Sequence, residues 1–372
     1  MGVALAGFKT EAVIELDRYC CDTIRENKAA KHPLIRNWTL LDKDVRLVNF
    51  KDYRDKVSLV SGGPPCQPFS LGGKHRAYRD DRDLWSEAVR AVREARPSAF
   101  IFENVKGLTR QAFANYYEYI YLQLSYPTIK RDADELWNDH LARLEQHHTS
   151  KKTYRGLSYR VVRRVLNAAN YGVPQKRERV FFVGFRADLG IEWHFPEHTH
   201  SLDSLIWEQV ISGDYWERHE VAKQHRLVPA KWRARARLLP EPGLKPWRTT
   251  RDAISDLPNP ASHAADRVLN HRLQLGARSY PGHTGSALDE PAKTLKAGVH
   301  GVPGGENMIA LPDGSVRYLT VRESARLQTF PDDFRFHGSW TETMRQLGNA
   351  VPVQLACTVA TSVRDHLDRI QE

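Results

Sequence analysis

The sequence has few cysteines and no long apolar run, and these absences exclude several classes of protein. Four of its 372 residues are cysteine, two of these are adjacent (Cys20 and Cys21), and no CxxC pattern occurs. A disulfide framework and a cysteine zinc site are therefore excluded, which favours a reducing, cytosolic setting. No run of about 18 uncharged apolar residues exists, and charges are scattered through residues 1–20, so we expect neither a membrane span nor a secretory signal.

The composition is that of a basic protein with enough apolar residues to build a core. Lys and Arg number 55 against 45 Asp and Glu, a net charge of +10, and 41% of the residues are hydrophobic. A basic chain favours polyanionic partners, because each neutralised phosphate releases counterions, although charge that serves solubility alone explains the excess equally well.

Short apolar runs alternate with helical patterns in the first half of the chain. Strands are expected at residues 12–16, 57–60, 99–102 and 180–185, and a helix at 83–93. Apolar strands without alternation, separated by helices, indicate an α/β fold whose parallel sheet is buried on both faces.

Changes of texture along the chain divide it into two expected domains. A polar stretch with a helical stripe at residues 113–150 predicts a helical insertion, and segments broken by Pro and Gly begin near residue 187. We therefore expect a catalytic, cofactor-binding domain formed by 1–186 plus 340–372, and a smaller irregular domain at 187–339.

Cys66 lies in the sequence GPPCQP at residues 63–68, directly after an expected strand. Ligands of open α/β sheets bind beyond the carboxyl ends of the strands, and the flanking prolines restrict the backbone on both sides of the Cys-Gln pair. Most single cysteines are buried fillers, but a core cysteine does not need this rigid loop. The pattern favours a reactive thiol.

Glu103 follows the expected strand at 99–102 in the same way. Its carboxyl group should point into the same crevice, where partial desolvation can raise its pKa and let it donate a hydrogen bond to a ring nitrogen. The alternative is a glutamate that caps the next helix. A thiol and a carboxyl group at two strand ends suit nucleophilic attack on an activated heterocycle.

Five motifs, in order, resemble those of bacterial DNA cytosine-5 methyltransferases of the restriction–modification type, and the resemblance extends from residue 2 to about residue 360. The motifs are PCQ at 65–67, ENV at 103–105, QKRER at 175–179, RESARLQ at 322–328 and GNAV at 348–351. The resemblance implies a Rossmann-like, S-adenosylmethionine-dependent methyltransferase sheet with an irregular target-recognition domain. It also implies methyl transfer to C5 of a cytosine flipped out of a specific site in duplex DNA.

The same resemblance assigns roles to four residues of the catalytic site. Cys66 would be the nucleophile that attacks C6 of the flipped cytosine. Glu103 would contact N3 and the exocyclic amine and stabilise the covalent adduct. Arg179, together with Arg177, would bind the flipped nucleotide and support the carboxylate.

Five residues match positions that bind the cofactor in this family. Glu15 matches the acid that hydrogen-bonds ribose hydroxyls, and Asp44 matches the acid that contacts adenine. Pro65, Leu84 and Asn349 fall on cofactor-lining positions. For Asp44 and Leu84, a turn acid and a core leucine remain open alternatives.

One departure from the family concerns the beginning of the chain. The family begins with a strand and a glycine-rich loop that holds the methionine end of the cofactor, whereas this sequence opens at a segment resembling the helix after that loop. We therefore expect the first strand and its loop to be missing, which would leave unpaired strand edges. A start codon placed too late is the favoured explanation, and a natural truncation is the alternative.

Contacts with DNA are expected from two basic segments. The loop at residues 70–79, which includes Ser70, Lys74 and Arg76, resembles the family's catalytic loop that closes on DNA. Residues 221–240 hold six basic residues and no acidic one. Arg233 and Arg235 of this stretch suit phosphate contacts, although a solvated run of charge is an alternative.

A third DNA contact is expected from a pair that resembles the Thr-Leu pair of family target-recognition domains, Thr294 and Leu295. Side chains near residues 294–307 are then expected at base edges of the major groove. His194, His198 and His200 have no cysteine or acidic cluster beside them, so no metal site is expected there.

Two alternative functions remain open from the sequence, and several partners are expected. The rivals are an RNA cytosine-5 methyltransferase, which the sizeable irregular region disfavours, and an N-terminally truncated, inactive homologue that binds DNA. We expect a monomer that acts on double-stranded DNA of the bacterial nucleoid in the cytoplasm, without a membrane partner, and with any cognate restriction endonuclease acting separately.

Overall fold

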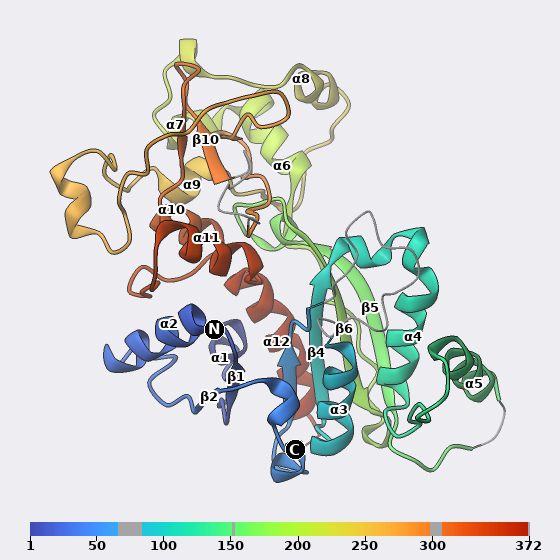
Figure 1. The fold of residues 1–372 in the computed structure, drawn as a ribbon. Helices are drawn as coiled ribbons and strands as arrows, with labels where there is room; N and C mark the ends of the chain where they lie inside the picture. Colours follow the sequence, from blue (N-terminus) through green and yellow to red (C-terminus); the bar gives the residue numbers. More distant parts are fainter. Residues whose placement is uncertain (66–83, 151–152, 298–306, 371–372) are drawn as a thin grey trace. The chain divides into compact units, whose positions relative to one another are not determined.

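The computed structural model describes residues 1–65, 84–150, 153–297 and 307–370, and these form two compact units (Figure 1). The first unit comprises Met1–Asp42, Asn167–Arg177 and Pro196–Val359, and the second comprises Lys43–Leu166, Glu178–Phe195 and Ala360–Glu372. Their bounds differ from those of the two domains expected from the sequence, and that expected division stays a prediction. Among the described residues, no helix is long and apolar enough to cross a membrane.

A four-stranded sheet in the order β3-β4-β6-β5 is the centre of the second unit. Its strands are β3 (Leu59–Gly62), β4 (Ala99–Val105), β5 (Tyr159–Asn167) and β6 (Glu178–Arg186). The first six residues of β4 are all buried, as the apolar run at its start predicts. The expected strands at 57–60, 99–102 and 180–185 are thus present, each with somewhat different ends.

The direction of β6 differs from the expectation. β3 runs parallel to β4, but β6 runs antiparallel to it, with Phe100 opposite Gly184 and Val105 opposite Arg179. A buried strand has the same apolar run in either direction, so the sequence pattern could not distinguish a parallel from an antiparallel neighbour.

Three helices of the second unit surround its core. They are α3 (Trp85–Ala95), α4 (Ala114–Ser125) and α5 (Trp137–Thr149), and Figure 1 shows α3 and α4 lying along the sheet. The helix α3 buries Trp85, Val89 and Val92, which belong to the same core cluster as Phe100 and Phe102 of β4. The helices α4 and α5 occupy the stretch expected to be a helical insertion.

The first unit contains many short elements. Its strands are β1 (Val13–Glu15), β2 (Leu40–Asp42), β7 (His200–Ser201), β8 (Lys245–Pro246), β9 (Ser286–Ala287), β10 (Met308–Ala310) and β11 (Val316–Tyr318). Its helices are α1 (Gly2–Leu5), α2 (Arg18–Ala29), α6 (Leu202–Trp207), α7 (Asp214–Arg218), α8 (Ala230–Ala236), α9 (Thr250–Ile254), α10 (Val321–Leu327) and α11 (Trp340–Asn349). The closing helix α12 (Val353–Asp368) begins in this unit and ends in the second.

Two apolar clusters stabilise the first unit. One joins Ile309 of β10 and Leu295 to residues of α9, α10 and α11. The other packs α6 and α7 against Trp232 and Ala236, which lie four residues apart on one face of α8. Their burial leaves the opposite face of α8 to its basic side chains.

Candidate active site

The carboxyl ends of β3 and β4 bring Gly63 and Pro64 beside Glu103. Gly62 pairs with Phe102 across the parallel strands, so the next residues along each strand are neighbours. A Cβ atom added at Gly63 would lie 3.3 Å from Glu103 Oε2, and Asn104 Nδ2 donates a hydrogen bond to Pro64 O at 2.8 Å. The loop that leads to Cys66 therefore starts against the carboxyl group of Glu103.

Glu103 forms an ion pair with Arg179, which comes from the antiparallel strand β6. Arg179 Nε lies 2.8 Å from Glu103 Oε1, and each side chain is only 11% exposed. Burial lowers the pKa of Arg179, and the Glu103 carboxylate opposes that shift, so the guanidinium stays charged. A charged partner within hydrogen-bond reach orients the carboxyl group, leaving its second oxygen on the side of Gly63.

Four of the expected site residues, namely Cys66, Ser70, Lys74 and Arg76, lie outside the described residues. The described residues on either side of that stretch, Pro65 and Leu84, are hydrogen-bonded to each other. Leu84 N donates a hydrogen bond to Pro65 O at 3.2 Å. Leu84, the residue before α3, is half-buried, and Pro65 is exposed.

The other expected cofactor residues lie at ends of elements. Glu15 ends β1 and is half-buried, and its Oε1 accepts hydrogen bonds from the backbone N–H groups of Leu16 and Asp17, each at 2.8 Å. Asp44 is a half-buried turn acid whose carboxylate accepts from the backbone N–H of Arg46 at 2.9 Å. Asn349 is the exposed last residue of α11.

Arg177 is two residues from Arg179 in the sequence, but it belongs to the other compact unit. Its guanidinium is fully buried and donates hydrogen bonds to main-chain carbonyl groups of its own unit, those of Leu295, Gly348 and Ala350. These contacts do not support the expected binding of the flipped nucleotide by Arg177.

The Thr-Leu pair is also held inside the first unit. Thr294 Oγ1 donates to Lys176 O at 2.6 Å, and the Leu295 side chain is 1% exposed within the apolar cluster. Two buried glutamines were not singled out from the sequence: Gln175, which accepts from Leu295 N, and Gln328, which accepts from Gln175. Their only signal was their presence in the QKRER and RESARLQ motifs.

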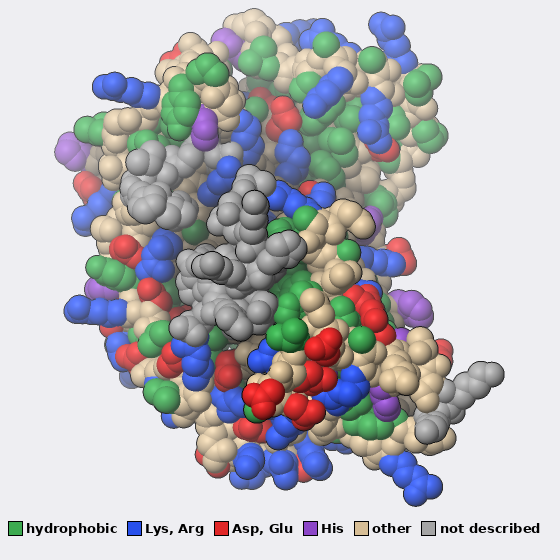
Figure 2. All heavy atoms as spheres, turned by 45° about the vertical axis from the view of Figure 1, so that its right-hand side comes forward, with side chains coloured by type: hydrophobic (Ala, Val, Ile, Leu, Met, Phe, Trp, Pro, Cys, Tyr) green, Lys and Arg blue, Asp and Glu red, His purple; other side chains and the backbone are tan. Residues whose placement is uncertain are grey.

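The expected phosphate-binding arginines lie on α8. Arg233 and Arg235 are both exposed, and Arg235 forms an ion pair with Asp203 at 2.6 Å. In the space-filling view of Figure 2, Lys and Arg side chains are interspersed with Asp and Glu over the face drawn. The case for α8 therefore depends on its local sequence and exposure.

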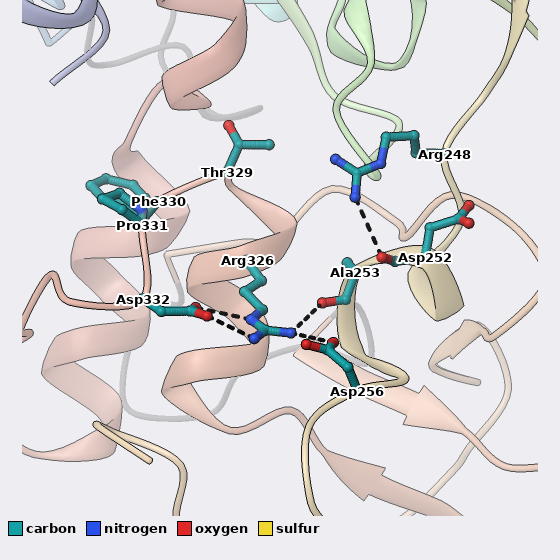
Figure 3. A pocket seen from close by; sticks show the side chains of 9 residues that line it. All are labelled: Arg248, Asp252, Ala253, Asp256, Arg326, Thr329, Phe330, Pro331 and Asp332. Atoms are coloured by element: carbon teal, nitrogen blue, oxygen red, sulfur yellow. Dashed lines mark hydrogen bonds and ion pairs between the residues drawn. The ribbon is translucent and has the colours of Figure 1, made fainter.

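A cavity of about 490 Å³ lies elsewhere in the first unit. Figure 3 shows Arg326 between Asp332 and Asp256, with Arg248 directed toward Asp252. Arg326 donates two hydrogen bonds to Asp332, at 2.9 and 2.7 Å, and one to Asp256. None of the described site residues expected from the sequence lines this cavity. Its arginines already have partners, since Arg326 pairs with Asp332 and Asp256, and Arg248 donates to the main-chain oxygen of Asp252.

Comparison with known proteins identifies the class of enzyme. The family model of C-5 cytosine-specific DNA methylases matches residues 1–126 and 139–365. The Type II methyltransferase M.PspPI of Psychrobacter sp. is 31% identical over 370 residues, which cover 98% of this chain and 75% of the relative. The Type II methyltransferase M.Eco47II of Escherichia coli is 31% identical over 380 residues, covering 100% of this chain and 77% of the relative.

Solved structures show the same fold. The Dnmt2 methyltransferase of S. pombe superposes with a TM-score of 0.54 at 13% sequence identity, covering 100% of this chain and 95% of that one. At this identity the likeness concerns the fold alone. It confirms the expected α/β methyltransferase architecture.

The chain belongs to the C-5 cytosine-specific DNA methylase family. It is a DNA cytosine-5 methyltransferase of the bacterial restriction–modification type, which uses S-adenosylmethionine and acts on DNA. The alternative of an RNA methyltransferase is not favoured, because the matched family and the relatives in sequence are DNA enzymes. The unmatched residues 127–138 fall between α4 and the first turn of α5, within the expected helical insertion.

Proposed function

We propose that this enzyme methylates a flipped cytosine through a transient covalent bond from Cys66, with Glu103 and Arg179 as the other catalytic residues. The observation that carries the proposal is the buried Glu103–Arg179 ion pair beside Gly63 and Pro64. Cys66 follows Pro65 directly in the sequence. A nucleophile attached to this segment and a carboxyl group at the same sheet edge are what addition to a pyrimidine requires.

The chemistry assigns one task to each residue. The Cys66 thiolate forms a bond to C6, and the displaced electron pair makes C5 nucleophilic, while Glu103 holds a proton at N3 and contacts the exocyclic amine. Arg179 keeps the carboxyl group oriented. Once C5 carries the methyl group, loss of the C5 proton restores the ring double bond and expels the cysteine sulfur.

The residues proposed to hold the cofactor fit S-adenosylmethionine, which supplies the methyl group when bound. Glu15 is an acid at the carboxyl end of a parallel strand, where such acids accept hydrogen bonds from ribose hydroxyls. Backbone N–H groups already hold its Oε1, so the carboxylate is fixed in direction. We propose Asp44, Pro65, Leu84 and Asn349 as further cofactor-lining residues.

For DNA, we propose phosphate contacts from the exposed Arg233 and Arg235 of α8, with further contacts from Ser70, Lys74 and Arg76. The segment that begins at Thr294 and Leu295 is proposed to approach base edges. Because the Leu295 side chain is buried, its contribution is to anchor the segment.

We also propose the organisation in which the enzyme works. Residues 1–186 with 340–372 form the catalytic domain and residues 187–339 the target-recognition domain. The enzyme acts as a monomer on duplex DNA of the nucleoid in the bacterial cytoplasm, and a cognate endonuclease, where one exists, acts separately.

Trapping on DNA that carries 5-fluorocytosine tests the proposal, because the fluorine cannot leave as a proton does. With added S-adenosylmethionine, the wild-type chain should form a covalent complex, and Cys66→Ser should form none. Cys20→Ser is the matched control, since burial raises the pKa of the Cys20 thiol and keeps it protonated. A complex formed by Cys66→Ser, or none formed by the wild type, would refute the proposal, and bisulfite sequencing of plasmid DNA from expressing cells reports the target site.

A further inference from the structure

Three fully buried polar side chains form a hub in the first unit. Gln175 and Arg177 precede β6, and Gln328 follows α10; each is 0% exposed. Burial of an amide or a guanidinium is costly unless its polar atoms are hydrogen-bonded, so the partners of these three side chains matter.

Arg177 joins two segments of main chain that lie about fifty residues apart in the sequence. Its Nη1 donates to Leu295 O at 2.9 Å, and its Nη2 donates to Gly348 O at 2.6 Å and to Ala350 O at 2.8 Å. The two segments also touch directly, because a Cβ atom added at Gly348 would lie 2.2 Å from Ala297 N.

The two glutamines complete the hub from either side. Gln175 Oε1 accepts a hydrogen bond from Leu295 N at 3.0 Å, and its Nε2 donates to Gln328 Oε1 at 3.2 Å. Gln328 Nε2 in turn donates to Ala350 O at 3.2 Å. Residues 294–297 and 348–350 are therefore held against each other by one connected set of buried hydrogen bonds.

The geometry needs a guanidinium at position 177. The planar guanidinium of arginine donates hydrogen bonds to carbonyl groups in several fixed directions, whereas lysine has all its donors on one ammonium nitrogen at the end of a flexible chain. A lysine would keep the charge but could not reach all three acceptors from one position.

We propose that Arg177 is a positioning residue for DNA recognition, which holds the Thr294–Ala297 segment against Gly348–Ala350 at the C-terminal end of α11 and takes no part in bond making. The inference rests on the proposed function, in which this segment approaches base edges. A loosened segment must be ordered again by each DNA site it binds. That cost falls equally on the ground state and the transition state, so it raises KM for DNA and leaves kcat unchanged.

The test compares Arg177→Lys with Arg179→Lys in steady-state methylation of a duplex that carries the target site. We expect Arg177→Lys to raise KM for DNA about tenfold, the size expected for one lost charge-assisted hydrogen bond, with kcat within about twofold of the wild type. Arg179→Lys should show the opposite pattern, a lower kcat with a smaller change in KM. A fall in kcat at constant KM in Arg177→Lys would overturn the proposal.

Hydrogen exchange in the free protein provides a readout that does not depend on activity. Arg177→Lys should speed exchange in peptides covering both 292–297 and 347–351, and leave peptides from β4 unchanged. Faster exchange in only one of the two segments, or in neither, would overturn the proposal. If the wild type methylated no DNA, the proposed function would fail. The exchange pattern would still show whether Arg177 holds residues 294–297 against residues 348–350.

Gly348→Ala perturbs the same contact without changing Arg177, which keeps the test valid if Arg177→Lys does not fold. Its added Cβ pushes the C-terminal end of α11 away from the main chain of Lys296 and Ala297. We expect the same rise in KM for DNA and the same faster hydrogen exchange in peptides covering both 292–297 and 347–351. Gly243→Ala is the matched control, since nothing lies within 4 Å of its added Cβ. An unchanged KM for DNA and unchanged hydrogen exchange in Gly348→Ala would count against the proposed coupling of residues 294–297 to residues 348–350.

Discussion

Replacing Arg179 with Met removes the guanidinium from the Glu103 carboxylate and keeps a side chain of similar length. The two groups are 2.8 Å apart and each is 11% exposed, so the pair is largely shielded from water. Removing one partner of a buried pair costs about 3–5 kcal/mol, because the other charge stays in a poorly solvated place. Since about a tenth of each side chain remains exposed, we expect the lower end, about 3 kcal/mol, in the free energy of unfolding.

Urea unfolding of the wild type, Arg179→Met, Glu103→Gln and the double variant measures this coupling. Once Glu103 is neutral, the second change should cost much less than it does in the wild type. Methylation should fall about 100-fold in kcat for Arg179→Met, the lower end of what a positioned acid or base contributes. Equal costs of Arg179→Met in both backgrounds, or a kcat close to that of the wild type, would show that the pair neither stabilises the site nor orients the carboxyl group.

Two further predictions concern DNA binding and acid stability. Replacing both Arg233 and Arg235 with Ala should reduce the magnitude of the slope of log K for DNA binding against the logarithm of the salt concentration by about 2, for every DNA sequence. The control Arg18→Ala on α2 should leave this slope unchanged. An unchanged slope in the double variant would exclude both residues from phosphate contact. Pairing with Arg143 lowers the pKa of Glu135 to about 2 from its ordinary 4.5, so the charged carboxylate stabilises the folded state above pH 4.5, and this contribution is lost as the pH falls to about 2. Glu135→Gln should therefore lower the melting temperature at pH 7 by an amount that shrinks between pH 4.5 and pH 2, and a difference independent of pH would contradict the assignment.

The sequence predicted three of the four strands described in the second unit, without β5, and it placed Glu103 beside the segment that follows β3. An apolar run such as AFIF at residues 99–102 is a strong signal because it has to be buried on both faces, and β4 starts at the same residue. The carboxyl ends of neighbouring parallel strands share one edge of a sheet, so the nearness of Gly63 and Glu103 followed from chain direction.

The sequence did not predict that the two arginines of the QKRER motif, Arg177 and Arg179, lie in different parts of the structure. Arg177 and Arg179 alternate in sequence and would share a face if both lay in one strand, but β6 begins only at Glu178. Arg177 therefore belongs to the unit that contains Leu295 and Gly348, and its guanidinium is directed at their carbonyl groups. A spacing of two residues says nothing about where a strand starts.

The sequence by itself determined the class of enzyme, the apolar strands and the acid at a strand end, because these depend on local patterns and on residue types that chemistry requires. Only the tertiary structure decided that β6 runs antiparallel, that Arg179 and not Arg177 pairs with Glu103, and that Arg177 and Leu295 are buried. Those outcomes depend on contacts between residues far apart in the chain. The sequence around a hydrogen-bond donor does not identify the distant carbonyl group that accepts from it, because that pairing depends on how the folded backbone brings the two together.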